Sequence, residues 1–264
     1  MTEFLSGLAG LDIPIMSWCL LLLAGMCVGL SKTAIPGGGI LAVVLTATAL
    51  PSRMSVGVLL PMLIFGDFFA IGKYRPHIDR KQLATLLPFA LIGLGVGYAI
   101  LRFVTNEQLK PIIGGAVLAM LALQQVNARL KKRREGATAE NRPVSPVVTA
   151  IFGVLSGMGT GMANAAGPIL SLYLLIAGLP KLQFIATSSG FFFILNLLKV
   201  PLFASLGIIT TQSLRIDLMA LPSVLVGALL GFWLVTRIPQ EVFNSHILTN
   251  PKAVGYLSRL LADR

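Results

Sequence analysis

The sequence has few acidic residues, histidines and cysteines, and each shortage argues against a class of function. It contains 10 Asp and Glu, 2 His and 2 Cys among 264 residues. It shows no Ser-His-Asp set, no His/Cys metal cluster and no phosphate-binding Gly-Lys-Ser/Thr loop, so it predicts no enzyme, no ATP-driven pump and no cofactor. Cys19 and Cys27 lie eight residues apart, about 12 Å along a helix, which is too far for a disulfide.

Charged residues of either sign are also scarce, and most of the chain consists of long apolar runs. Charged residues make up 12% of the chain and hydrophobic ones 55%, with a mean hydropathy of +0.85. This is the composition of a membrane protein that crosses the bilayer several times. The net charge of +11 would suit a nucleic-acid partner, but the basic residues lie in short segments between apolar runs, as in cytoplasmic loops. The sequence therefore predicts an all-α polytopic membrane protein that binds no nucleic acid.

Two apolar runs are interrupted by residues that suit no lipid-facing helix. The first break, residues 29–39, contains a proline and three consecutive glycines. The second runs from Gly157 through Asn164 to Gly167-Pro168, about 128 residues later. Broken backbone at membrane depth is tolerated only where protein or a water-filled cavity covers it. Two breaks in corresponding positions are typical of the binding site of a secondary transporter.

The apolar runs predict about 7–8 transmembrane segments, with short half-helices forming a V-shaped unit around each break. The predicted helices are 15–31, 37–50, 55–72, 84–104, 110–126, 146–162, 165–179, 184–206 and 215–236. We divide the chain into a first transmembrane repeat (1–126), a basic cytoplasmic linker (127–145) and a second repeat (146–264). Residues 244–264 make a weak last helix. There the sequence leaves open a missing span, an interfacial helix or a different reading frame.

Matching residues recur in the same order in both halves, which predicts duplication of a unit of about 125 residues. The matches are Gly25/Gly153, Gly29/Gly157, Gly39/Gly167, Pro51/Pro180, Asp67/Asn196, Pro88/Pro222, Gly93/Gly227, Gly97/Gly231 and Glu107/Glu241. Small residues also recur because membrane helices pack through them. The ordered proline and polar matches nevertheless favour duplication.

The distribution of basic residues predicts opposite orientations for the two repeats. The loop with Lys73, Arg75, Arg80 and Lys81 and the linker 127–145 are expected in the cytoplasm. The first V-shaped unit then opens to the outside, where the N-terminus lies, and the second opens to the cytoplasm. Counting each unit as one long span would instead place the N-terminus in the cytoplasm without a basic residue, which we consider the weaker alternative.

Lys32 is the sharpest candidate for a binding residue. A charged group at membrane depth marks a substrate or ion pathway by default, and freed backbone N–H groups at a helix end would add positive potential. The alternative is that Lys32 lies near an interface and extends its ammonium to water. The candidate substrate-binding residues around the two breaks are Lys32, Thr33, Gly37, Gly38, Gly39, Asn164 and Gly167.

A second group of candidates lies in the predicted helix 184–206. Asn196 and Lys199 share one face, and Ser188 and Ser189 lie near the start of that helix. Hydroxyls, an amide and an ammonium around a cavity suit an oxyanion, although Asn and Ser also join membrane helices through hydrogen bonds. Asp67, well inside an apolar run, either carries a coupling proton or pairs with a buried lysine.

These patterns resemble those of a known family. The residues that carry the resemblance are Gly25, Gly29, Gly37-Gly38-Gly39, Gly153, Gly157, Gly161, Gly167-Pro168, Thr187-Ser188-Ser189, Asn196-Leu197-Leu198-Lys199-Val200-Pro201, Gly207, Pro222, Gly227 and Gly231. In their order and duplication the chain resembles the sulfite exporter TauE/SafE family of membrane permeases, over roughly residues 17–243. The resemblance implies an inverted-repeat carrier in the bacterial inner membrane that moves small organosulfur compounds or sulfur oxyanions, in most members outward.

The leading hypothesis is therefore a secondary transporter of small sulfur-containing anions, an exporter or permease that works by alternating access. Its expected partners are a small anionic solute, the lipid bilayer, and a coupling proton or sodium ion. A non-transporting membrane partner or assembly subunit and an anion channel are the alternatives. The sequence indicates no oligomeric state.

Overall fold

The chain is all-helical in the part that the computed structural model describes, residues 13–34, 39–133 and 144–237. The described residues form nine α-helices and one 3-10 helix, and no strand. They are α2 (Ile15–Thr33), α3 (Gly39–Ala49), α4 (Ser52–Tyr74), η1 (Arg75–His77), α5 (Arg80–Phe103), α6 (Asn106–Arg133), α7 (Pro146–Ala163), α8 (Gly167–Ile176), α9 (Lys181–Ser205) and α10 (Thr211–Arg237). Each predicted helix is present within a few residues, whereas Gly37, Gly38 and residues 244–264 lie outside the described part.

Six of these helices are long and apolar enough to cross a membrane, and many of their large apolar side chains face outward, as in Phe68, Phe103 and Leu218. The protein is thus a multi-pass membrane protein. The first limb of each broken unit is longer than the half-helix we expected, because α2 has 19 residues and α7 has 18. Only the second limbs, α3 with 11 residues and α8 with 10, are half-length. Helix α6 continues to Arg133, so residues 127–133 extend a helix where we expected the linker to begin.

Helix starts follow local chemistry. The Asp79 carboxylate caps α5 by accepting hydrogen bonds from the backbone N–H groups of Lys81 (3.1 Å) and Gln82 (3.0 Å). Proline precedes α2 and α4, at Pro14 and Pro51. Its ring removes a backbone donor, which the first turn of a helix tolerates.

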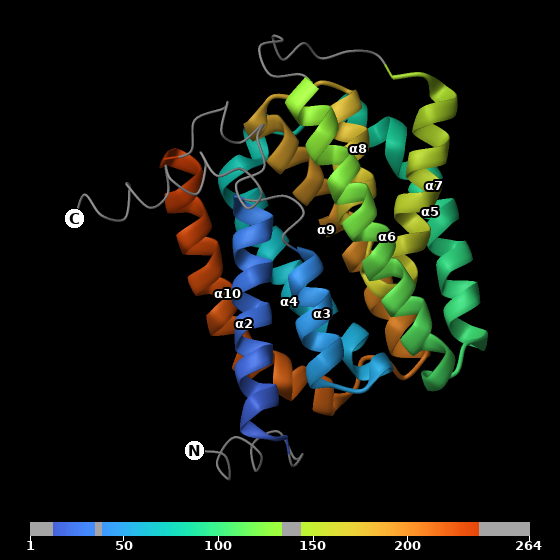
Figure 1. Ribbon diagram of the computed structural model, residues 1–264, viewed down its shortest axis with the longest axis vertical. Coiled ribbons are helices and arrows are strands. Elements are labelled where there is room, and N and C mark those ends of the chain that lie inside the picture. The colour runs from blue at the N-terminus through green and yellow to red at the C-terminus, as the bar shows by residue number, and fades with distance from the viewer. Residues whose placement is uncertain (1–12, 35–38, 134–143, 238–264) are drawn as a thin grey trace.

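The two broken units point in opposite directions (Figure 1). The start of α2 and the connection from α3 to α4 lie at the lower end of the molecule. The start of α7 and the connection from α8 to α9 lie at the upper end. Within each unit the second helix, α3 or α8, therefore runs back toward the end at which the first helix began.

Two pairs of helices, α2 with α10 and α5 with α7, pack through glycine. A Cβ atom added to Gly29 of α2 would overlap the carbonyl oxygen of Val224 in α10. A Cβ atom added to Gly157 of α7 would overlap the carbonyl oxygen of Ala90 in α5. Such close approach of two backbones is the usual role of small residues in membrane helices.

The reverse contacts of the same pairs also correspond. Gly227 of α10 abuts the carbonyl oxygen of Met26, and Gly93 of α5 abuts the carbonyl oxygen of Val154. Gly93 and Gly227 are one of the sequence matches, and Met26 and Val154 share the 128-residue spacing of Gly29 and Gly157. Each pair therefore joins one helix from each half through equivalent atoms.

Candidate functional site

A cavity of about 50 Å³ lies where the two breaks meet α9. Its wall contains hydroxyl and amide side chains, and Lys32 is the one charged residue on it among the described residues. The lining residues are Ser31, Lys32, Gly39, Ile40, Val43, Leu63, Met120, Thr160, Asn164, Gly167, Pro168, Ser171, Ile185, Ser188, Ser189, Phe192 and Asn196. The space fits a few water molecules or one small solute.

Most of the predicted binding residues that are described lie on this wall. They are Lys32, Gly39, Asn164, Gly167, Ser188, Ser189 and Asn196. Thr33 does not line the cavity, because its hydroxyl donates to the carbonyl oxygens of Gly29 (2.8 Å) and Ala228 (3.2 Å) on the side facing α10. Lys199 also lies behind the wall and is fully buried.

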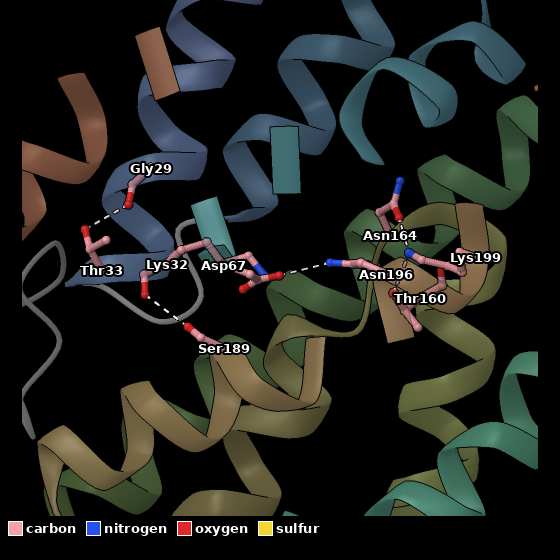
Figure 2. Close-up of polar contacts among 9 residues, drawn as sticks. All are labelled: Gly29, Lys32, Thr33, Asp67, Thr160, Asn164, Ser189, Asn196 and Lys199. Carbon is pink, nitrogen blue, oxygen red and sulfur yellow. Dashed lines mark hydrogen bonds and ion pairs between the residues drawn. The ribbon is translucent and has the colours of Figure 1, made fainter. Parts of the chain in front are cut away.

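Lys32 forms a buried ion pair with Asp67 (Figure 2). The Lys32 Nζ atom lies 2.8 Å from Asp67 Oδ1 and 3.0 Å from Oδ2. The Asn196 side-chain amide donates to the same Oδ2 at 3.0 Å. The Lys32 side chain is 11% exposed and Asp67 is fully buried. Lys32 therefore does not extend to water outside the protein, and Asp67 pairs with a lysine, one of the two roles expected for it.

The Lys32 ammonium also lies over an aromatic ring. Its Nζ atom is 4.4 Å from the centre of the Phe192 ring, and Phe192 lines the cavity. A cation over a ring face is stabilised by the ring quadrupole. The backbone carbonyl of Lys32 accepts a hydrogen bond from the Ser189 hydroxyl at 3.3 Å. These contacts hold the end of α2 against α9.

Lys199 organises the second break. Its ammonium donates to the Thr160 carbonyl (3.2 Å), to the Thr160 hydroxyl (2.9 Å) and to the Asn164 side-chain oxygen. These three acceptors match the three donors of an ammonium group. Because Thr160 and Asn164 both line the cavity, Lys199 fixes part of the wall from behind.

Asn164 ends α7 in the left-handed conformation, with φ of 55°. Asn tolerates this conformation better than most residues. Its side-chain amide donates to the carbonyl oxygen of Val56 in α4 at 3.1 Å. The second break is thus tied both to α9, through Lys199, and to the first half.

Both half-length helices present their first residue to the cavity, Gly39 for α3 and Gly167 for α8. A helix N-terminus carries unpaired N–H groups and partial positive charge. A Cβ atom on Gly167 would meet nothing within 4 Å, so the backbone there faces open space. The two N-termini thus add backbone donors and partial positive charge to the wall near Lys32, whose own charge is paired with Asp67.

The cavity wall is built from corresponding positions of the two halves. Four pairs of lining residues are 128 residues apart and a fifth pair is 129 apart. They are Lys32/Thr160, Gly39/Gly167, Ile40/Pro168, Val43/Ser171 and Leu63/Phe192. Our sequence analysis missed Thr160 and Ser171. The 128-residue spacing would have identified Thr160, because it corresponds to the candidate Lys32. It gives no such signal for Ser171, whose counterpart Val43 is apolar and was not a candidate.

The described residues contain no group of three or more His, Cys, Asp or Glu side chains that could hold a metal ion.

Residues 21–249 match the family model described as Sulfite exporter TauE/SafE. Comparison with curated proteins and with solved structures finds no match. The matched range contains both breaks and every residue that lines the cavity.

Proposed function

The chain belongs to the sulfite exporter TauE/SafE family, a family of membrane transporters, and from this premise we propose that it is a secondary carrier that moves a small sulfur-containing oxyanion or organosulfonate through the cavity between its two breaks. The observation that carries the proposal is the convergence of Lys32 and the N-termini of α3 and α8 on one cavity. Oxyanions bind to helix N-termini and ammonium groups because both supply hydrogen-bond donors and positive charge.

Each part of the wall has a role in this proposal. Lys32 supplies the charge, while Asn196 and Ser188 supply neutral hydrogen-bond donors to the oxyanion. The Ser189 hydroxyl donates to the Lys32 carbonyl and can donate to the oxyanion only when it leaves that carbonyl. Thr160 and Asn164 are held in place by Lys199. The cavity volume of about 50 Å³ favours a solute of sulfite or sulfonate size over a large organic anion.

We propose that the two halves are inverted repeats and that transport occurs by alternating access. The opposite directions of the broken units and the equivalent glycine contacts of α2 with α10 and of α5 with α7 support this. In this arrangement the glycine-packed pairs move as units and the two breaks act as opposing gates. The basic residues of η1 and of the end of α6 favour a cytoplasmic position for those ends, and in this proposal the start of α2 lies outside.

Flux measurements in proteoliposomes test the proposal. Purified protein is reconstituted, and the flux of sulfite, sulfoacetate, taurine, thiosulfate and sulfate is followed with and without a proton or sodium gradient. Saturable flux of one of these solutes is expected. A gradient that accelerates it would identify the coupling ion, for which Asp67 is the candidate residue.

Lys32→Ala is the variant that tests the binding site, because it removes the one charged side chain on the cavity wall among the described residues. We expect it to abolish saturable flux in protein that remains monodisperse in detergent. Flux that does not saturate would indicate a channel. Absence of flux of all five solutes by folded wild-type protein would contradict the proposal and favour a non-transporting partner.

A further inference from the structure

We propose that Asp67 serves as the counter-ion of Lys32 in the empty carrier. When the cavity is filled, the Lys32 ammonium turns from Asp67 to the transported anion. The inference rests on the proposed anion transport, because it assigns a second partner to the same lysine. It concerns the return of the empty carrier, which substrate binding alone does not explain.

The positions of the two groups support this exchange of partners. Lys32 is on the cavity wall, whereas Asp67 is absent from the wall and fully buried behind it. One ammonium group therefore lies between a buried carboxylate and the space open to solute. Asn196, which lines the cavity, also donates to Asp67 at 3.0 Å, so the carboxylate keeps one hydrogen bond when Lys32 turns away.

Of the other acids in the described part of the chain, Asp79 caps α5 and Glu107 is exposed at the start of α6. Among the helices packed against α4, the lysines nearest to Asp67 are Lys32 of α2 and Lys199 of α9, and Lys199 is held by Thr160 and Asn164. Helix α3 contains no charged residue. Helix α10 approaches Thr33, the neighbour of Lys32, at Gly231. Its buried acid, Asp217, lies 14 residues before Gly231. That separation is about 21 Å along the helix.

The physical consequence concerns movement between the two orientations of the carrier. An ammonium group without a counter-ion is costly to bury, and the cost falls on any step that closes the cavity around it. The wild-type carrier can close either with the anion on Lys32 and a proton on Asp67, which leaves no carboxylate charge unpaired, or, when empty, with Asp67 on Lys32. A carrier without the Asp67 carboxylate can close at low cost only when the anion is bound.

Asp67→Asn tests the inference because it removes the charge and keeps the size of the side chain. Radiolabelled sulfite is the probe, and two modes are compared in proteoliposomes: net efflux into sulfite-free buffer, and exchange against unlabelled sulfite. We expect net efflux to fall by at least about tenfold while exchange stays within about twofold of wild type. Asp67→Glu restores a carboxylate and is expected to recover part of the net efflux.

Asp217→Asn is the matched control, since Asp217 is the other buried carboxylate of the described helices and neither of its oxygens has a hydrogen-bond partner. It should leave the ratio of net efflux to exchange unchanged. An equal fall of both modes in folded Asp67→Asn protein, or no change in either, would overturn the inference. Failure of the proposed function would appear separately, as absence of saturable sulfite flux in wild-type protein.

Discussion

Lys32 and Asp67 form an ion pair with an Nζ to Oδ1 distance of 2.8 Å, in which the Asp67 side chain is fully buried and the Lys32 side chain is 11% exposed. A buried ion pair contributes little net stability, because the attraction between the charges is offset by the loss of their hydration. Removing one partner alone is different, because it leaves the other charge buried without compensation. The stability of the protein therefore depends on the two residues jointly. Replacing either one should destabilise the protein, and replacing both by apolar residues should restore stability.

The first prediction concerns this coupling. Lys32→Met or Asp67→Leu alone should lower the free energy of unfolding by about 3–5 kcal/mol, since each leaves an unpaired buried charge. The double variant replaces both charges by apolar groups and should be more stable than either single variant. Unfolding of the purified proteins in detergent measures all four stabilities. Additive losses in the double variant would show that the two side chains do not depend on each other.

The second prediction compares two glycines of α5. A Cβ atom on Gly93 would overlap the Val154 carbonyl of α7, whereas a Cβ atom on Gly95 would meet nothing within 4 Å. Gly93→Ala should force α5 and α7 apart and cost about 1–3 kcal/mol. Gly95→Ala should be neutral or stabilising by up to about 1 kcal/mol, because alanine favours the helix. Thermal unfolding in detergent gives the comparison.

Gly227→Ala extends this test to the other helix pair. If the contact of Gly227 with Met26 corresponds to that of Gly93 with Val154, the two alanine variants should lose similar stability. A large loss for one and none for the other would show that the helix pairs are not equivalent.

The helices were predictable from the sequence because membrane segments are defined by apolar length and by proline and glycine. All nine predicted segments appear as helices, and the break between α7 and α8 begins at Asn164, inside the stretch from Gly157 to Pro168 that was predicted to contain it. The same rule predicted half-helices at α2 and α7, but these helices have 19 and 18 residues and are long enough to cross a membrane. Lys32 and Thr33 were assigned to the break, yet they complete the last turn of α2, where the Thr33 hydroxyl replaces solvent by bonding to Gly29.

The sequence predicted which residue types form the site but not which of their side chains face the cavity. Asp67 and Asn196 were matched across the halves, and the structure joins them directly by a hydrogen bond. Sequence spacing could not tell which polar side chains face the cavity, because the face that a helix turns inward depends on its neighbours. Lys199 was therefore assigned to the wall, although it lies behind Thr160.

The third prediction separates the backbone of Asn164 from its side chain. Asn164→Gly keeps the left-handed conformation but loses the acceptor for Lys199 and the donor to Val56. Asn164→Ala loses the same contacts and pays in addition about 1 kcal/mol for the left-handed backbone. Both should reduce saturable anion flux, and Ala should have the lower melting temperature. Wild-type flux in the glycine variant would show that Lys199 does not need this amide.

The fourth prediction concerns the orientation in the membrane. In a background with Cys19 and Cys27 replaced by serine, single cysteines are placed at Pro14 and Ser145, the exposed residues just before α2 and α7. If the broken units enter from opposite sides and basic ends face the cytoplasm, a membrane-impermeant maleimide added to whole cells should label Pro14→Cys. Ser145→Cys should become reactive only after the membrane is opened. Labelling of both cysteines from outside would contradict the inverted arrangement. Labelling of Ser145→Cys alone would keep the inversion and reverse the orientation, because the two helix starts would still lie on opposite sides.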